Sequence, residues 1–482
     1  MSPAPGLICN IACEEPIVPY KPVDSETVAA LRSVCGDAYV MTDRPGMEPF
    51  SHDYTEDLVF YPEVVVRPRT TAEVQAVMRL AYARDIPVTP RGGGTGLSGG
   101  ALPIHGGILL SIDRMNAILE IDTENMMGVL EPGVITQVYQ EAVEAQGLFY
   151  PPDPASKGSC TMGGNVAECA GGPRAAKYGV TRDWIYALDV VMPDGRLVRT
   201  GSQCLKDVTG YNLTQLFVGS EGTLGVVTQI TTRLMTLPPF RQTLLIAFAT
   251  MEQALATVVE IFRRGYQPSA CEFMERAAIQ VAIAQKGAKV PHADAEAQLL
   301  IEVDGFDLDL VENTLLAIGE LAMENEAVEV TVAQQPGQQK TLWDIRRACG
   351  EAVKSISIYK EEDAVVPRKH IVTLMRGVQA ITKEHGITAI CYGHAGDGNI
   401  HINILKMDMT DHDWNERLPG GITAIFELVV SLGGRISGEH GIGYTQRPYL
   451  PIALSSDELD VMRQIKAALD PKGLLNPDKI FI

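Results

Sequence analysis

The sequence predicts an α+β protein with two or three domains. Its 482 residues exceed what one ordinary hydrophobic core holds, and 46% of them are hydrophobic, which is ample for several packed cores. In the N-terminal half, short apolar strands follow one another without the long intervening helices of a doubly wound sheet. In the C-terminal half, the order strand, helix, strand occurs twice, which favours an antiparallel or mixed sheet covered by helices.

The N-terminal quarter contains one well-marked βαβ unit. About the first fifty residues are irregular apart from a helical stretch, SETVAALRSVCG, for which Ser25 is the expected N-cap. From Val64 the chain reads as strand, helix, strand and glycine loop, with Thr70 and Glu73 at the spacing of a helix capping box. Three short strands then follow at close spacing, in GGILLSID, AILEID and MMGVLEPGV.

The pattern of the chain changes near residues 237–239, which read Leu-Pro-Pro. Beyond this point, the segments that begin QTLLIAF and AQLLIEV each read as strand, helix, strand, as expected for a separate α+β domain. The chain ends with a helix that opens at the capping box of Ser455 and Glu458 and stops before Pro471.

The charge balance argues against nucleic acid or an anionic membrane as a partner. Forty basic and 60 acidic residues give a formal net charge of −20, and no basic patch interrupts it. The N-terminal residues have no basic stretch ahead of an apolar one, and no segment approaches the roughly 20 apolar residues of a membrane helix. We therefore expect a cytoplasmic protein.

The nine cysteines are scattered along the chain, and only Cys9 and Cys13 stand close together. Their spacing, CNIAC, matches no familiar zinc or iron–sulfur pattern, so we expect structural thiols in a reducing compartment. Any bound metal ion therefore needs other ligands.

A glycine-rich loop, PRGGGTGLSGGA, follows the second strand of the βαβ unit. It contains a formal G-x-G-x-x-G from Gly94 to Gly99, but a dinucleotide fingerprint also needs a helix that opens at the third glycine. Pro103 and the glycines after it oppose such a helix, so we reject the Rossmann interpretation. Six of the nine residues 92–100 are glycine, and such a backbone can aim successive amides at an anion.

Two further segments combine small residues with amides and hydroxyls. They are residues 151–183, which begin PPDPASKGSCTMGGN, and residues 207–229, which include GSEGTLGVVT. Small residues let a flat ring lie against the backbone, while polar groups bond to its edge. Each segment alone would be taken for a loop, but three of them in this order indicate one shared ligand.

The stretch CYGHAGDGNIH places His394 and His401 seven residues apart. On one strand they would point to opposite faces, and on one helix they would lie two turns apart. The turn residues Gly396-Asp397-Gly398 favour a hairpin, which can bring both histidines to one side. On their own, these residues fit turn-flanking core histidines at least as well as metal ligands.

With these motifs, the sequence resembles the FAD-binding superfamily of vanillyl-alcohol oxidase and p-cresol methylhydroxylase, and within it the 2-hydroxy-acid dehydrogenase branch. The resemblance runs from about residue 55 to the C-terminus. It implies a two-part FAD-binding domain with an inserted α+β substrate (cap) domain. The implied divisions are an N-terminal extension (1–55), the FAD-binding domain (56–237), the cap domain with the metal hairpin (238–420) and a C-terminal segment that returns to the FAD site (421–482).

The resemblance also implies the FAD contacts. The first loop corresponds to the pyrophosphate loop, the second segment lines the isoalloxazine ring, and the third closes the site. Family members often tether the flavin through a histidine of the first loop, which has none here, so we expect non-covalent FAD. The implied contacts are Arg91, Gly92, Gly93, Gly94, Thr95, Gly96, Leu97, Ser98, Pro152, Asp153, Gly158, Thr161, Gly163, Gly164, Asn165, Gly171, Gly172, Gly222, Gly225, Val226, Val227 and Asn476.

The hairpin histidines acquire a role through the same resemblance. Branch members coordinate a divalent metal through a GHxGDGNxH hairpin and the glutamate of an EHG motif, which match His394, His401 and Glu439. Two imidazoles and a carboxylate suit zinc, iron or manganese. The neighbouring His440 matches the general base of the family.

Two more residues are candidate substrate contacts, one from the family match and one from its place on the same strand face as His401. Arg346 corresponds to the arginine that binds the substrate carboxylate, with Arg347 as its expected solvent-exposed neighbour, and Asn403 is a candidate polar contact. D-2-hydroxyglutarate dehydrogenases carry a lysine two residues before an aspartate that matches Asp363, where this chain has Glu361. A contact to a second substrate carboxylate is therefore not expected, which favours short substrates.

The resemblance thus implies FAD-dependent oxidation of a short 2-hydroxy acid, glycolate or D-lactate, to the 2-oxo acid. Electrons would pass to a separate acceptor, an iron–sulfur subunit or an electron-transferring flavoprotein, because no iron–sulfur or haem motif occurs in this chain. Three alternatives stay open: a D-2-hydroxyglutarate dehydrogenase, a non-redox enzyme like alkyl-dihydroxyacetonephosphate synthase, and a subunit that keeps FAD for structure alone.

Overall fold

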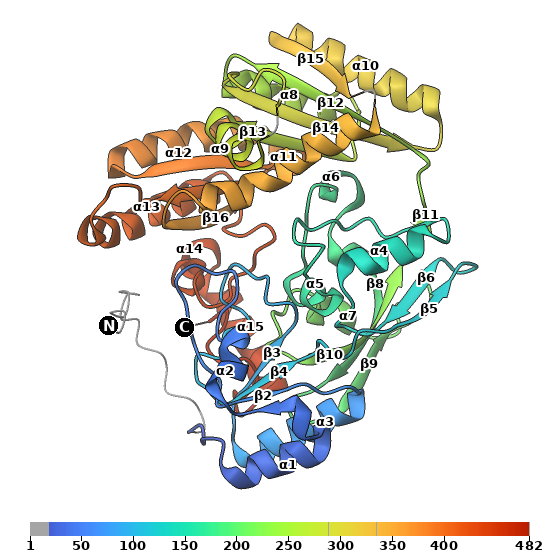
Figure 1. Ribbon diagram of the computed structural model, residues 1–482, viewed down its shortest axis with the longest axis vertical. Coiled ribbons are helices and arrows are strands. Elements are labelled where there is room, and N and C mark those ends of the chain that lie inside the picture. Colours follow the sequence, from blue (N-terminus) through green and yellow to red (C-terminus); the bar gives the residue numbers. More distant parts are fainter. Residues whose placement is uncertain (1–18, 288, 334, 482) are drawn as a thin grey trace.

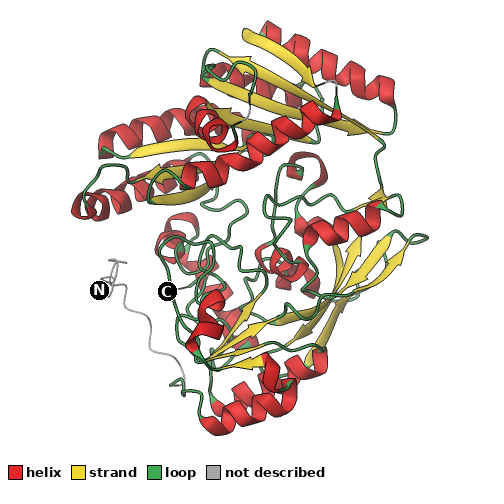
Figure 2. Cartoon of the chain, in the orientation of Figure 1, coloured by secondary structure: helices red, strands yellow, loops and turns green. Residues whose placement is uncertain are grey.

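The computed structural model describes residues 19–287, 289–333 and 335–481, so the close pair Cys9 and Cys13 lies outside the described residues. Figure 1 shows one large sheet with its helices in the upper half and the other sheets below it. In Figure 2 helices flank the strands in both halves, as the predicted α+β class requires. Within the described ranges, none of the helices combines the length and the apolarity needed to cross a membrane.

The first sheet contains the predicted βαβ unit. Its strand order is β1 (Val40–Met41), β2 (Val64–Val66), β4 (Ile108–Ser111), β3 (Val88–Arg91). The strands β2 and β3 each pair with β4 in parallel, and helix α3 (Thr71–Arg84) connects β2 to β3. Thr70 caps α3 as predicted.

The N-terminal segment packs onto this first sheet. Helix α1 (Ser25–Cys35) contacts α3, and β1 adds an antiparallel edge strand. The N-cap is Asp24, whose side chain accepts from the amide of Thr27 at 2.7 Å, so the predicted cap at Ser25 was one residue late. The short elements that follow are η1 (Asp37–Tyr39), α2 (Arg44–Met47) and η2 (Glu48–Phe50).

The second sheet is fully antiparallel. Its order is β5 (Ile118–Asp122), β6 (Met127–Leu130), β10 (Val226–Arg233), β8 (Ile185–Val191), β9 (Leu197–Gly201). A two-stranded sheet joins β7 (Leu148–Phe149) to β11 (Met235–Thr236). The helical segments beside these sheets are α4 (Thr136–Glu144), α5 (Met162–Glu168), α6 (Ala175–Tyr178), η3 (Thr181–Trp184) and α7 (Leu213–Phe217).

The third sheet has seven antiparallel strands. Their order is β15 (Ala327–Ala333), β12 (Phe240–Phe248), β14 (Ala297–Gly305), β13 (Ala270–Glu275), β17 (Thr388–His394), β18 (Asn399–Leu405), β16 (Tyr359–Val365). One core joins the sheet to α8 (Met251–Arg263), α10 (Leu308–Glu324), α12 (Ile371–His385) and α13 (Asp411–Ser431). A second core joins it to α9 (Arg276–Lys286) and α11 (Pro336–Lys354). The two predicted strand–helix–strand units are therefore both present.

The C-terminal residues return to the first sheet. After η4 (Arg368–His370) and η5 (Arg447–Tyr449), the last helices are α14 (Leu450–Ala453) and α15 (Ser456–Leu469), and α15 opens with the predicted capping box. Leu475 forms a parallel bridge with Val88 of β3. Helix α13 runs across the expected division at residue 420, and its residues Ile422 and Phe426 belong to the core of the seven-stranded sheet.

Candidate active site

The three glycine-rich segments surround one cavity of about 640 Å³. One wall is the loop after β3, another is the segment that includes α5, and a third is the turn before β10. The opposite side is lined by α11 and by Glu439 and His440. The predicted FAD contacts that line it are Arg91, Gly92, Gly93, Gly94, Thr95, Gly96, Leu97, Gly158, Thr161, Gly163, Gly164, Asn165, Gly171, Gly222, Gly225, Val226 and Val227.

The first two loops approach each other so closely that glycine is required. A Cβ atom on Gly92 would lie 2.5 Å from Oγ1 of Thr161, and one on Gly93 would lie 2.5 Å from the carbonyl oxygen of Ser159. Any side chain at either position would push the loops apart. The backbone amides can therefore face a ligand directly, which fits the phosphates and the ring of a dinucleotide such as FAD.

Five predicted contacts are not among the residues that line the cavity: Ser98, Pro152, Asp153, Gly172 and Asn476. The carbonyl of Ser98 accepts the amide of Tyr444 at 2.7 Å. Asn476 donates to the carbonyls of Gly100 and Glu221 at 3.0 and 2.8 Å. Asp153 pairs with Lys157 at 2.7 Å. Ser98, Asp153 and Asn476 therefore have partners within the protein that hold these segments in position.

The hairpin of β17 and β18 brings the two histidines together. His401 pairs with Tyr392, and His394 pairs with Asn399 two positions along the ladder, with the pair of Gly393 and Ile400 between them. Because alternate residues of a strand share a face, His394 and His401 are diagonal neighbours on one face, with ring centroids 5.2 Å apart. The hairpin prediction is confirmed.

Glu439 completes the predicted cluster. Its Oε1 atom lies 3.2 Å from Nε2 of His394 and 3.5 Å from Nε2 of His401. Burial would raise the pKa of Glu439, but the neighbouring histidines outweigh it and hold the pKa well below its ordinary value. The three ligand atoms lie within 4.8 Å of one another, close enough to share one metal ion.

A carboxylate that sequence reasoning missed orients one of these ligands. Both carboxylate oxygens of Glu272 lie 2.9 Å from Nδ1 of His394, which leaves Nε2 directed at Glu439. Metal-binding histidines are typically oriented in this way by a second carboxylate. Glu272 is fully buried on β13, and a charged residue inside the apolar strand ACEFME was the available signal.

Arg346 lies beside this cluster and does not line the large cavity. Its Nη2 atom is 2.6 Å from Oε2 of Glu272. Its neighbour Arg347, expected to face solvent, does line the cavity, although 38% of its side chain is exposed. Asn403 is fully buried, and neither of its amide atoms has a hydrogen-bond partner among the described residues. A buried amide without partners fits contact with a ligand.

The loop of residues 437–443 is held from two sides by carboxylates. Oδ2 of Asp363 accepts the amides of Gly438, Glu439 and His440 at 2.8, 2.7 and 2.8 Å. The carboxylate of Glu221 accepts the amides of Ile442 and Gly443 at 2.8 and 2.6 Å. Neither role was predicted, because no local pattern connects these distant residues.

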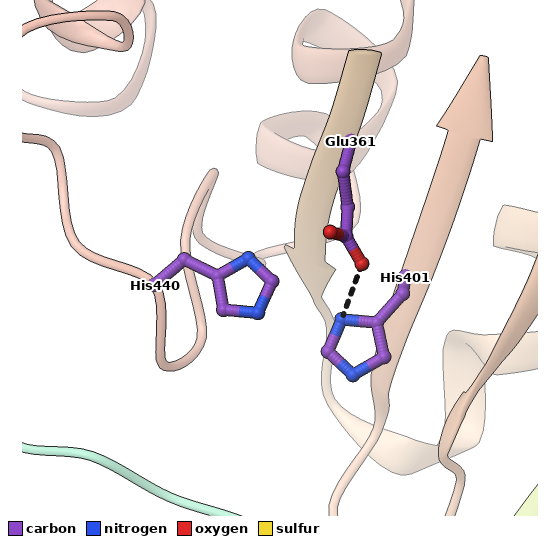
Figure 3. A group of neighbouring side chains, drawn as sticks. All are labelled: Glu361, His401 and His440. Atoms are coloured by element: carbon purple, nitrogen blue, oxygen red, sulfur yellow. Dashed lines mark ion pairs between the residues drawn. The ribbon is translucent and has the colours of Figure 1, made fainter. Parts of the chain in front are cut away.

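His440 stacks on His401, with ring centroids 5.1 Å apart and planes 10° apart. Burial opposes protonation of His440, but the carboxylates of Asp363 and Glu361 outweigh it and raise its pKa. Burial and the charge of His440 lower the pKa of His401 to about 4, which keeps that imidazole neutral. Figure 3 shows the Glu361 carboxylate directed at the ring of His401, with His440 beside them.

Glu361 offers a second, overlapping ligand group with His401 and His440. Its Oε1 atom is 3.9 Å from Nδ1 of His401, farther than Glu439 is from either histidine of the first group. Its Oε2 atom is 2.7 Å from Nζ of Lys354. Burial would raise the pKa of Glu361, but the charges of Lys354 and His440 lower it to about 2. The first group is therefore the better candidate for a metal site.

Two family descriptions match the chain. Residues 62–201 match the FAD binding domain, and residues 237–480 match the C-terminal domain of FAD linked oxidases.

Curated relatives cover nearly the whole chain. The glycolate oxidase subunit GlcD of Bacillus subtilis is 40% identical over 435 residues, which are 90% of this chain and 92% of that protein. A D-lactate dehydrogenase of Anaerostipes hadrus is 36% identical, with 96% and 98% covered. A D-2-hydroxyglutarate dehydrogenase of Stutzerimonas stutzeri is 32% identical, with 95% and 99% covered.

Solved structures share the fold. A p-cresol methylhydroxylase superposes with a TM-score of 0.80 at 16% identity, covering 94% of this chain and 96% of that one. An alkyldihydroxyacetonephosphate synthase superposes with a TM-score of 0.74 at 18% identity, covering 97% and 86%. The predicted fold class is confirmed. At these identities the likeness concerns the fold alone.

Proposed function

Because this chain belongs to the FAD-linked oxidase family, we propose that it oxidises a short 2-hydroxy acid, such as glycolate or D-lactate, to the 2-oxo acid. The observation that carries the proposal is that Glu439 and His440 line the same cavity as the three glycine-rich segments. A candidate ligand and a candidate base therefore face the space that fits FAD. FAD held there would supply the acceptor for the hydride of the substrate.

We assign the metal site to His394, His401 and Glu439. The donor set of two imidazoles and a carboxylate suits zinc, iron or manganese, and Glu272 orients His394 as a metal ligand requires. A divalent ion there would lower the pKa of a substrate hydroxyl, as zinc lowers that of bound water to about 7.

His440 is the proposed base. Its imidazole takes the proton of the substrate hydroxyl, and the carboxylates of Asp363 and Glu361 favour the imidazolium that forms. Asp363 also fixes the main chain at His440. The position of this base therefore depends on a residue from the seven-stranded sheet.

Arg346 is the proposed partner of the substrate carboxylate. Glu272 lies beside one end of its guanidinium, and its Nε atom has no hydrogen-bond partner among the described residues. A buried guanidinium with a free donor favours an arriving carboxylate. Asn403 supplies a second set of unpaired donors and acceptors.

The test is an anaerobic screen of 2-hydroxy-acid enantiomers that follows the loss of oxidised-flavin absorbance. We expect rapid bleaching by one enantiomer series of short substrates, and slow bleaching in the His440→Asn variant. If no 2-hydroxy acid bleaches the flavin of the wild-type protein, the proposed function is wrong.

The electron acceptor is proposed to be a separate protein, an iron–sulfur subunit or an electron-transferring flavoprotein. One relative is described as a subunit of glycolate oxidase, and no iron–sulfur or haem motif occurs in this sequence. We expect substrate oxidation in air to produce little peroxide and to speed up with an added artificial acceptor. Peroxide equal to substrate turnover would instead indicate a plain oxidase.

A further inference from the structure

The cavity is lined by a lysine that forms an ion pair with a buried glutamate. Lys354 is the last residue of α11, and its Nζ atom lies 2.7 Å from Oε2 of Glu361 on β16. The lysine side chain is 21% exposed and lines the cavity, whereas the glutamate side chain is only 4% exposed and does not. The ammonium is therefore the side of this pair that an entering ligand meets.

This pair stands next to the proposed base. Glu361 and His440 present side-chain atoms within 4.8 Å of each other, and Lys354 and His440 line the same cavity. Gly350, one turn before Lys354 on α11, also lines the cavity and has no side chain to fill the space. A substrate held at His440 would therefore extend its carbon chain toward Lys354.

Glu361 is itself held firmly. Its Oε1 atom accepts the hydroxyl of Tyr392 at 3.2 Å, while Oε2 faces Lys354. A substrate carboxylate at Lys354 would have to compete with this buried carboxylate and would also be repelled by it. A methyl group or hydrogen at the same place meets neither cost, because the pair as a whole is neutral.

We propose that Glu361 and Lys354 determine substrate selectivity. Glu361 forms an ion pair with the ammonium group of Lys354, which would otherwise bind the second carboxylate of a 2-hydroxy dicarboxylic acid. The enzyme then selects monocarboxylates. This inference rests on the proposed function, since it concerns which 2-hydroxy acid reacts at the same site.

The test compares kcat/KM for lactate, malate and 2-hydroxyglutarate of one enantiomer series, using the holoenzyme. In the wild-type protein, we expect lactate to be preferred over both diacids. Glu361→Gln keeps the shape of the side chain and removes its charge, so Lys354 becomes available. The ratio of diacid to lactate kcat/KM should rise roughly 10- to 100-fold, as expected for a hydrogen bond to a charged group. Adding Lys354→Met should cancel the rise.

Three results would overturn the inference. The first is a wild-type enzyme that uses a diacid as efficiently as lactate, which needs no variant to observe. The second is an unchanged ratio in Glu361→Gln, or in Glu361→Ala if the glutamine variant does not bind FAD. The third is a gain that survives Lys354→Met. A wild-type enzyme that oxidises neither glycolate nor any of these three acids would instead refute the proposed function.

Discussion

Oδ2 of Asp363 accepts the main-chain amide of His440 at 2.8 Å. The same oxygen accepts the amides of Gly438 and Glu439, and the hydroxyl of Ser437 at 3.0 Å. One buried carboxylate oxygen therefore positions both the proposed metal ligand and the proposed base. Charge-assisted hydrogen bonds of this kind are stronger than neutral ones.

We expect Asp363→Asn to slow flavin reduction by roughly 100-fold, because one such bond is worth about 1.5–3 kcal/mol and the amide nitrogen cannot accept. Bound FAD should be unchanged, and bound metal should fall. Stopped-flow spectroscopy measures the rate of flavin reduction, and metal analysis measures the bound metal. Asp460→Asn, at an exposed position on α15, is the matched control and should behave as wild type. Normal reduction in Asp363→Asn would contradict the positioning role.

The two roles assigned to the histidines can be separated. His394→Ala and His401→Ala each remove one of three proposed ligands, so bound metal and flavin reduction should fall together. His440→Asn should keep the metal and lose roughly 10²–10⁴ in the rate of reduction, without recovery on metal addition. Metal analysis alongside single-turnover reduction distinguishes the cases. If His440→Asn loses the metal and His394→Ala keeps it, the assignment is wrong.

Glu272→Gln tests the orientation of His394. The amide oxygen of glutamine can still accept from Nδ1, but it lacks the negative charge that makes His394 a stronger ligand, so we expect metal affinity to fall roughly 10- to 100-fold. A chelator competition assay measures this affinity. The control is Glu275→Gln: Glu275 lies three residues further along the same strand, and its replacement should leave the metal affinity unchanged. Equal affinities in wild type and Glu272→Gln would refute this role.

FAD should be released intact by acid precipitation, at about one FAD per chain. The loop of residues 90–101 has no histidine to tether the flavin, and the close approach of Gly92 to Thr161 leaves no space for a larger residue. Absorbance of the supernatant and pellet after centrifugation measures the release. Flavin that stays with the precipitated protein would show a covalent link.

Glu362→Gln should stabilise the protein at high pH. Burial raises the pKa of the Glu362 carboxyl from 4.5 to about 7. Below pH 4.5 both the folded and unfolded states hold this proton, and between pH 4.5 and about 7 only the folded state does. Stability therefore falls as pH rises across this range and levels off above it. The loss is on the order of 3 kcal/mol, which the neutral amide avoids. Urea midpoints of variant and wild type should differ more at pH 8 than at pH 5, and equal differences would contradict this prediction.

The sequence by itself determined the local structure and the chemistry of the motifs. Hydrophobic periodicity and capping residues placed α3 and α15, and turn residues at Gly396 to Gly398 predicted the hairpin. Hydrogen bonds and steric limits within a few residues govern these features. The motifs also carried the family resemblance, and with it the cluster of His394, His401 and Glu439.

Only the tertiary structure decided which residues stand behind that cluster. Glu272 reaches His394 across 122 positions of sequence, and Asp363 reaches His440 across 77. The same holds for Arg346, which the fold places against Glu272, while Arg347 faces the cavity. A buried charge must find a partner, but the sequence around it does not say which one, because partners are set by strand order and by the packing of distant segments.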